Sequence, residues 1–345
     1  MKTKEFKEFF KKYLETKKIL RPLFIEGSPG IGKTEIIRQI SKKCGYRCIV
    51  THLGSKTIDH FSGLPEFSKK DNGKLATTWS EPALVDLCNK DDVPTVLFLD
   101  DVHLASEIVI KILFEALTER AIHGEPLGNK VKVVGSMNEI SSEMGSTISE
   151  IPDPVRNRFI RLKIEPDLKD WLAYANKIGV DESIIGFLSF NNKFFCAAPA
   201  DESSQFPTPR SWVGLSEFFN EGFSPDTPGL VEGAVGKDAA IELLSFYEIF
   251  IKFDNEKPKT WDSLSSYKSK IAFIAYLLRK LDVDLVNKYL EDIVKDSAVA
   301  SFSLELVQKI IKKMSKENDQ SEEGRKFKEI ITKDDNFKKI NFLDI

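Results

Sequence analysis

The order of apolar and polar residues divides the chain into a helical start, an alternating middle and a helical remainder. Apolar side chains recur at helical spacing over residues 3–17, which predicts an amphipathic helix that docks on the domain behind it. From residue 23 to 165 short apolar runs alternate with helical patterns, and after Pro166 only helical patterns follow. Because such alternation is typical of parallel sheets with crossover helices, we expect an α/β middle and an all-α remainder.

Five short apolar runs in the middle region have the length and composition of buried strands. Their alternation with helices predicts a five-stranded parallel sheet inside an αβα sandwich. The runs are Leu23–Glu26, Cys48–Leu53, Thr95–Asp100, Val131–Ser136 and Phe159–Ile164. Two turn-rich inserts interrupt the pattern, one at residues 59–82, where Asp71-Asn72-Gly73 favours a hairpin, and one at residues 121–130.

Shifts in this pattern predict four parts: a helix at 1–20, an α/β core at 21–165, a helical lid at 166–255 and a C-terminal helical region at 256–345. The net charge of −3 gives no overall basic footprint for nucleic acid. Charges interrupt the apolar residues at the N-terminus, and no run of about 18 apolar residues occurs, so we expect a cytoplasmic protein outside the membrane. The spacing of the four cysteines and four histidines predicts no zinc, metal or catalytic role for them.

A glycine-rich loop directly follows the first predicted strand and precedes a helical pattern. It fits G-x-x-x-x-G-K-[ST], in which glycines let backbone N–H groups approach phosphates and the helix N-terminus favours negative charge. The sequence therefore predicts binding of a nucleoside triphosphate, with Lys33 on the outer phosphates and the Thr34 hydroxyl on Mg²⁺. The loop consists of Gly27, Ser28, Pro29, Gly30, Ile31, Gly32, Lys33 and Thr34.

Polar side chains stand at the ends of two later strands. Asp100 and Asp101 end the third apolar run, and Asn138 follows the fourth. We expect Asp100 to hold Mg²⁺ and Asp101 to orient or deprotonate the attacking water, since hydrolysis needs an anionic acceptor beside the γ-phosphate. The Asn138 amide can donate and accept at once, which suits it to placing that water.

In this order of elements the chain resembles the AAA+ ATPases. After the nucleotide loop, the acidic strand end and the polar strand end comes Ile151-Pro152-Asp153-Pro154-Val155-Arg156-Asn157-Arg158-Phe159. In that superfamily an arginine of such an Arg-Phe segment reaches into the ATP site of the neighbouring subunit. Arg158 matches this finger best and Arg156 is the second candidate. By analogy, loss of the finger costs on the order of 10³ to 10⁵ in turnover.

Further segments narrow the resemblance to the MoxR-like branch, in the group that shares the dynein-related ATPase domain. It covers about residues 20 to 255 and implies a ring, a hexamer, with a von Willebrand A domain protein as partner. The segments are Ser62-Gly63-Leu64-Pro65, Trp79-Ser80-Glu81-Pro82, Leu117-Thr118-Glu119-Arg120, Phe206-Pro207-Thr208-Pro209-Arg210-Ser211-Trp212 and Gly233-Ala234-Val235-Gly236.

The position of Arg210 also suggests an anionic partner on physical grounds. Thr208 is a good N-cap and Pro209 fits the first helical position, so Arg210 falls in the first turn of the next helix. A cation there opposes the helix dipole, and we therefore expect an anionic partner. In the family this arginine, called sensor 2, meets the nucleotide from the lid.

One residue departs from the family pattern, because Asp101 stands where AAA+ proteins usually carry Glu. The shorter side chain withdraws the carboxylate by one methylene, and a misplacement of about 1 Å can cost roughly 10²-fold in rate. The sequence therefore predicts slow hydrolysis of ATP. The alternative is an ATP-binding switch that hydrolyses very little ATP.

These observations lead us to expect an ATP-hydrolysing AAA+ remodelling chaperone that acts as a ring on a protein substrate. The alternative is a nucleic-acid motor subunit, such as a helicase or a restriction-type translocase. Few lysines occupy the two inserts, which makes nucleic acid the less favoured partner. The partner, the pathway and the choice between Arg156 and Arg158 do not follow from the residues.

Overall fold

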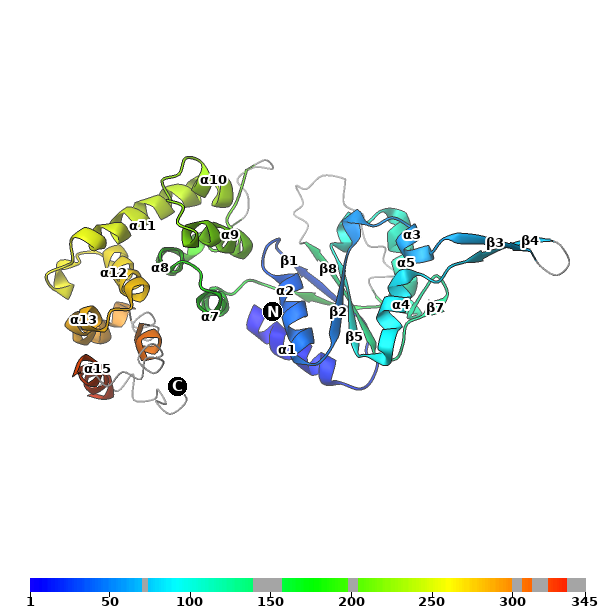
Figure 1. The fold of residues 1–345 in the computed structure, drawn as a ribbon, viewed down its shortest axis with the longest axis horizontal. Coiled ribbons are helices and arrows are strands. Elements are labelled where there is room, and N and C mark those ends of the chain that lie inside the picture. The colour runs from blue at the N-terminus through cyan, green and yellow to red at the C-terminus, as the bar shows by residue number, and fades with distance from the viewer. Residues whose placement is uncertain (70–73, 139–156, 198–203, 300–305, 312–321, 334–345) are drawn as a thin grey trace. The chain divides into compact units, whose positions relative to one another are not determined.

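A computed structural model describes residues 1–69, 74–138, 157–197, 204–299, 306–311 and 322–333. The chain divides into two compact units, unit 1 at Met1–Asp167 and unit 2 at Leu168–Ile345 (Figure 1). Each unit has a hydrophobic cluster of its own. The four-part division expected from the sequence stays a prediction.

Unit 1 contains a parallel sheet of five strands in the order β2-β5-β8-β1-β9, each paired in parallel with its neighbours. This is the α/β P-loop fold expected from the alternating pattern, and every predicted strand is present. Their bounds are β1 Leu23–Gly27, β2 Arg47–His52, β5 Thr95–Asp100, β8 Val131–Asn138 and β9 Ile160–Lys163.

Both faces of this sheet are buried, as β5 illustrates. Its apolar residues Val96, Leu97, Phe98 and Leu99 are all fully buried although they point alternately to opposite faces. Leu97 and Leu99 share a core cluster with helices α4 and α5, and the opposite face lies under α1 and α2 (Figure 1). The helices are α1 Thr3–Glu15, α2 Lys33–Lys43, α3 Asp59–Ser62, α4 Ala83–Asn89 and α5 Glu107–Thr118.

Helix α1 confirms the amphipathic pattern at the N-terminus. Phe6, Phe10 and Leu14 are buried against unit 1, and the Tyr46 hydroxyl donates to Leu14 O at 2.8 Å. Burial of three large apolar side chains stabilises this position by several kcal/mol, at roughly 1.5–3 kcal/mol for each.

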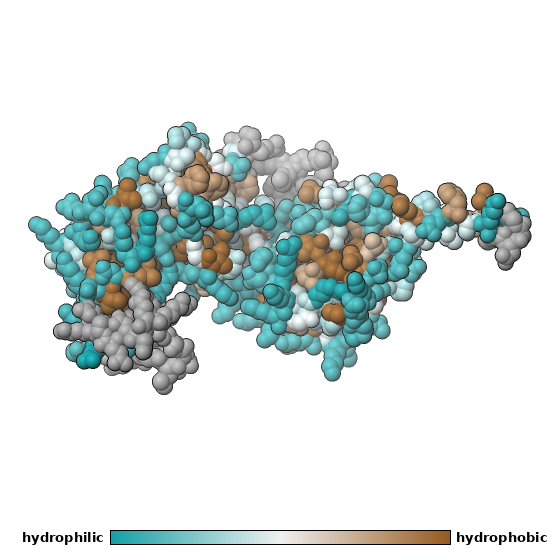
Figure 2. All heavy atoms as spheres, viewed as in Figure 1, coloured by the Kyte–Doolittle hydropathy of each residue, from teal (hydrophilic) through white to brown (hydrophobic). Residues whose placement is uncertain are grey.

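The first insert forms an antiparallel hairpin of β3 Pro65–Lys69 and β4 Leu75–Trp79, and its expected turn residues 71–73 lie outside the described residues. Paired residues share a face, so Phe67, Leu75 and Trp79 line one side, with Pro65, Thr77 and the single charged residue Lys69, while Glu66 and Ser68 lie on the other. Phe67 and Leu75 are 74% and 72% exposed, and brown side chains follow the projecting hairpin in Figure 2. We call this side the apolar hairpin face.

The second insert is a shorter hairpin, β6 Ala121–Ile122 with β7 Glu125–Pro126. It meets the first insert where the His123 ring packs edge-on against Trp79, with 5.2 Å between ring centroids. The two turn-rich inserts therefore lie side by side in unit 1.

Unit 2 is helical throughout its described residues, as the loss of strand patterns after Pro166 predicts. Its aromatic core includes Trp212, Phe246 and Phe273, and this core contains residues from both sides of the predicted boundary at 255/256. The helices are α7 Leu168–Ile178, α8 Glu182–Phe190, α9 Pro209–Asn220, α10 Leu230–Val235, α11 Lys237–Asn255, α12 Tyr267–Lys280, α13 Val283–Lys295 and α15 Glu322–Lys333. In the described part of the chain, no helix combines the length and the apolar character needed to cross a membrane.

Candidate nucleotide site

The carboxyl ends of three adjacent strands, β5, β8 and β1, meet at one edge of the sheet. Gly27 pairs in register with Asn138, and Leu99 pairs with Gly135, which brings Asp100 beside Ser136. Ligands of open α/β sheets bind at such carboxyl ends. Parallel pairing thus gathers residues that are more than 100 positions apart in the sequence.

The glycine-rich loop lies between β1 and α2, as the motif predicts. Gly30 and Gly32 have φ values of +74° and +88°, which residues with a Cβ rarely adopt, and Gly32 directly precedes the first turn of α2. A Cβ at Gly27 would come within 2.7 Å of Ile164 O, so this glycine also permits close packing against the end of β9. The loop therefore needs glycine both for its turn and for its packing.

Lys33 begins α2 and is only 7% exposed. Its Nζ donates to Gly27 O at 2.9 Å, to Ser28 O at 3.1 Å and to Asn138 Oδ1 at 2.8 Å. These acceptors hold the ammonium across the mouth of the loop. A buried cation at this place provides charge for an anionic ligand.

Thr34 and Asp100 are in direct contact. The Thr34 Oγ1 donates to Asp100 Oδ2 at 2.6 Å, and the Ser136 hydroxyl donates to Asp100 Oδ1. Asp100 is 4% exposed, so its carboxylate is held by hydroxyl groups in a nearly dry position. The sequence predicted no role for Ser136, because a polar residue near the end of an apolar strand is a weak local signal.

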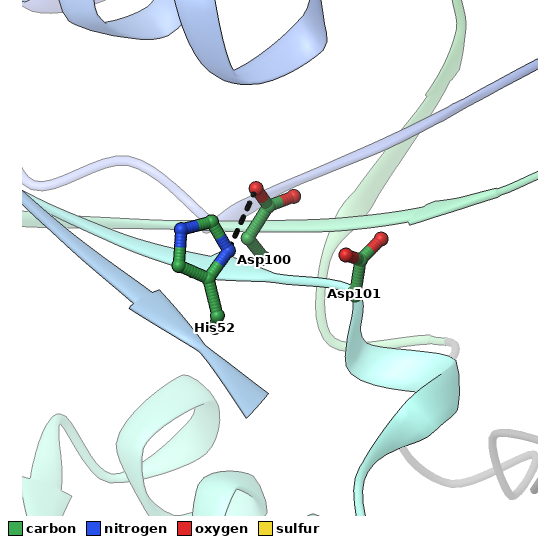
Figure 3. A group of neighbouring side chains, drawn as sticks. All are labelled: His52, Asp100 and Asp101. Atoms are coloured by element: carbon green, nitrogen blue, oxygen red, sulfur yellow. Dashed lines mark ion pairs between the residues drawn. The ribbon is translucent and has the colours of Figure 1, made fainter. Parts of the chain in front are cut away.

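Asp101 and His52 flank Asp100, as Figure 3 shows. The His52 Nδ1 lies 3.4 Å from Asp100 Oδ2, and possible ligand atoms of the three residues all lie within 4.8 Å of one another. Asp101 adopts a left-handed conformation with φ +55°, which turns the chain sharply after β5. We expected no role for the histidines from their spacing, yet β2 brings His52 opposite Asp100 through strand pairing.

His103 lies next to the predicted water-positioning residue. Because Asn138 Oδ1 accepts a hydrogen bond from Lys33, the Asn138 Nδ2 faces His103 Nε2, at a distance of 3.4 Å. This orientation puts the ring proton of a neutral His103 on Nδ1, a buried atom without a hydrogen-bond partner among the described residues. Burial lowers the pKa of His103, helped by Lys33 and opposed by the carboxylate of Asp101. The signal in the sequence is a histidine three positions after a strand-ending carboxylate.

The two finger candidates differ in what the structure shows. Arg156 lies outside the described residues. Arg158 precedes β9 and its Nη1 is 3.7 Å from Glu119 Oε1, with both side chains more than half exposed. Arg158 is therefore at the amino end of the strands, the edge opposite the glycine-rich loop.

Arg210 belongs to unit 2 and is described there by itself. Thr208 Oγ1 accepts from Ser211 N at 3.1 Å and Ser211 Oγ accepts from Thr208 N at 2.8 Å, a capping box with Pro209 at the start of α9. This confirms the predicted helix start and puts Arg210, which is exposed, in the first turn. Its meeting with a nucleotide stays a prediction.

Comparison with known proteins identifies the segment that carries this site. Residues 22–159 match the family model of the AAA domain of the dynein-related subfamily. The segment is therefore similar to an AAA domain. It contains the loop, the acidic strand end and Asn138 described above. A segment of 152 residues is also 25% identical to Midasin from Giardia intestinalis, and this match spans 42% of the present chain and 3% of Midasin.

Two solved structures are similar to this chain at low sequence identity and with TM-scores of 0.40 or less. One is the Thermotoga maritima RuvB Holliday junction branch migration motor, at 18% identity and a TM-score of 0.40 over 81% of this chain and 90% of RuvB. Another is NtrX from Brucella abortus, at 12% identity and a TM-score of 0.38 over 76% of this chain and 63% of NtrX.

Proposed function

We propose that the AAA domain binds ATP with Mg²⁺ and hydrolyses it within a homo-oligomeric ring that remodels a protein partner. The observation that carries this proposal is the 2.6 Å contact between the Thr34 hydroxyl and the Asp100 carboxylate, at the mouth of the glycine-rich loop. Hydroxyl and carboxylate oxygens are the ligands that Mg²⁺ prefers. The chemistry of the residues present therefore fits the nucleotide and its cation.

We assign a different role in hydrolysis to each polar residue around the loop. Bound ATP would supply the phosphoryl group, and its Mg²⁺ would offset part of the phosphate charge. Thr34 and Asp100 would hold Mg²⁺, His52 would orient the Asp100 carboxylate from outside, and the Lys33 ammonium would bind the phosphates. We assign Asp101 as the group that orients or deprotonates water, and Asn138, held by Lys33 and His103, as the amide that positions it.

The location of Arg158 supports a ring. Leu23 at the start of β1 pairs with Ile160 at the start of β9, whereas the loop follows the end of β1. Five residues of strand separate the two edges by about 16 Å at roughly 3.3 Å per residue. We infer that Arg158 serves the site of a neighbouring subunit, in a head-to-tail contact that closes as a hexamer.

The apolar hairpin face favours a protein as the partner. Phe67, Leu75 and Trp79 are exposed, and Lys69 is the one charged residue beside them, so apolar surface outweighs charge and suits contact with another protein better than contact with phosphates. The MoxR-like resemblance extends this proposal to a von Willebrand A domain partner. The alternative proposal is a nucleic-acid motor, for which salt-dependent DNA binding by the ATP-bound ring is the distinguishing result.

A mixing experiment tests hydrolysis and the shared site together. The R158A variant keeps the glycine-rich loop intact and lacks the arginine finger. The K33A variant keeps the finger and lacks the lysine of the loop. We expect each variant alone to hydrolyse ATP on the order of 10³-fold more slowly, and their mixture to regain a substantial part of the activity. A mixture of R156A with K33A distinguishes the second finger candidate.

The controls separate failure of the finger from failure of assembly. Mass photometry with ATP should show rings for R158A, and R161A is a matched control because Arg161 pairs with Glu26 of the same chain. A mixture that stays inactive although rings form contradicts a finger at Arg158. Unchanged ATP binding by K33A contradicts the nucleotide site itself.

A ring trapped with ATP identifies the partner class. The D101N variant should capture partners in ATP that K33A does not capture, with a von Willebrand A protein expected. Binding of duplex DNA by the same ring, weakened by salt, would instead favour the motor alternative.

A further inference from the structure

A cavity with several cations in its lining lies in unit 1 at the edge of the sheet opposite the glycine-rich loop. Its volume is about 290 Å³, and it opens where β5 and β8 begin and where the segment after α1 passes. The lining residues are Tyr13, Thr16, Lys17, Lys18, Ile19, Leu20, Tyr46, Pro94, Arg120, Asn129, Lys130, Val131 and Lys132. The predicted roles of the AAA domain do not use this cavity.

All the side chains in the lining that carry a charge at neutral pH are positively charged. Five cations line the cavity and no carboxylate does. Lys130 forms an ion pair with Asp92, but Lys17, Lys18, Arg120 and Lys132 have no carboxylate partner in the described part of the chain. Four positive charges around one small cavity repel one another unless an anion binds between them.

Arg120 is held at the cavity by unusual local structure. It has a left-handed backbone conformation, φ +56°, and its Nη2 donates to Gly128 O at 2.9 Å and to Val131 O at 2.8 Å. The remaining guanidinium N–H groups find no acceptor among the described residues. Burial lowers the pKa of Arg120, because desolvation of the cation is not offset by a carboxylate.

Lys132 is the second fixed cation. Its Nζ donates to Thr16 O at 2.8 Å and also to Tyr13 O, and lies 4.7 Å from the centre of the Tyr13 ring. An ammonium has three donors, so one is left for a ligand. Burial lowers the pKa of Lys132 as well. Two partly buried cations with spare donors are thus fixed before any ligand arrives.

We propose that this cavity binds a small free anion with two or more negative charges, of the pyrophosphate or phosphorylated-metabolite type. Its volume of about 290 Å³ is close to the lower end of the roughly 300–1,000 Å³ of small-molecule sites, which suits a diphosphate group better than a nucleic-acid strand. Arg120 supplies a fork for phosphate oxygens, Lys132 supplies a point charge, and the exposed Lys17 and Lys18 add two further positive charges to the lining.

Titration calorimetry with inorganic pyrophosphate tests this site. The K33A chain is used, because its glycine-rich loop has lost the lysine that would compete for the probe. We expect one equivalent of pyrophosphate to bind, and R120Q added to K33A to weaken binding about tenfold or more, as loss of hydrogen bonds to a charged group implies. The K17Q/K18Q pair should weaken it several-fold, since both rim charges are lost.

Controls make each result decisive. Lys42 and Lys43 form an equally exposed lysine pair on the last turn of α2, so K42Q/K43Q should leave the affinity within twofold. Because Arg120 also holds loop carbonyls, the R120Q chain is checked by thermal unfolding, and K17Q/K18Q tests the site without touching a buried group. Absence of pyrophosphate binding, or equal losses in both lysine pairs, overturns the proposal. Tighter binding of a single-stranded oligonucleotide than of pyrophosphate, lost in K17Q/K18Q, assigns the cations to nucleic acid and overturns it too.

Discussion

Each unit holds an aspartate in hydrogen bonds, buried for Asp100 and partly buried for Asp296, and the two differ in the charge of their partners. Asp296 of unit 2 accepts from Lys270 Nζ at 2.6 Å, from Trp261 Nε1 at 3.0 Å and from Ala298 N at 3.0 Å. Asp100 of unit 1 accepts from the hydroxyls of Thr34 and Ser136, with His52 beside it.

This difference separates a structural carboxylate from a functional one. A lysine neutralises Asp296, so the pair joins α12 to the end of α13 and has no charge to offer a ligand. Neutral hydroxyls orient Asp100 without cancelling its charge, which stays available for a cation. Burial of an acidic residue is therefore a weaker sign of function than the charge of the groups around it.

Replacing the functional carboxylate should give the largest effect. We expect D100N to lower Mg²⁺-dependent ATP hydrolysis on the order of 10³-fold, because the cation loses a charged ligand worth several kcal/mol. Steady-state phosphate release measures this. D296N is the matched control and should retain ATP binding, so equal loss of hydrolysis in both variants, each folded, would remove the distinction.

Lengthening the neighbouring carboxylate should have the next largest effect. D101E restores the side chain usual in AAA+ proteins and should accelerate a slow enzyme by up to roughly 10²-fold. Asp101 has a left-handed backbone, which Asp tolerates better than Glu, so thermal unfolding of D101E checks that the turn is kept. Unchanged turnover would contradict side-chain length as the limit on rate and favour the nucleotide-dependent switch.

Replacing the structural carboxylate should change stability rather than activity. The Lys270 ammonium, the Trp261 indole and the Ala298 N–H hold the pKa of Asp296 below its usual value, against a smaller effect of burial. D296N should lower the free energy of unfolding by about 1.5–3 kcal/mol at pH 7. Urea unfolding followed by tryptophan fluorescence measures this.

The same pair predicts a pH dependence with a definite sign. A carboxyl whose pKa is depressed by folding contributes stability above its unfolded pKa of about 4, and that contribution is lost as the pH falls through the lower folded value. The gap between wild type and D296N should therefore be full at pH 6 and shrink below about pH 4. A gap that grows as the pH falls would show that the Lys270 pair is not its source.

The apolar hairpin face should give the smallest change in stability. F67S and L75S remove exposed side chains, so the free energy of unfolding should stay within about 0.5 kcal/mol of wild type. The same variants should lose capture of the protein partner by the D101N ring. T78V on the opposite hairpin face is the control and should keep capture intact.

Most of the sheet was predictable because its strands are buried on both faces and read as continuous apolar runs. The Thr95–Asp100 run coincides with β5, and the runs for β1 and β8 extend by one and two residues in the structure. Helix α10 was not predicted, since Leu230–Val235 is too short for a clear helical period. The site was predictable where residues adjoin a motif, as for Lys33, and not where strand pairing supplies them, as for His52 and Ser136.

The sequence by itself determined the glycine-rich loop, the strand-ending acids and the capped start of α9, because each depends on neighbours within a few positions. Only the tertiary structure decided which polar groups meet. Parallel pairing of β5 with β8 brought Asp100 beside Ser136 and close to Thr34 at the start of α2. Packing of the segment after α1 gathered its lysines with Arg120 and Lys132 at the other edge. The local sequence sets the chemistry that a residue can perform, whereas tertiary structure sets which polar and charged groups lie beside it.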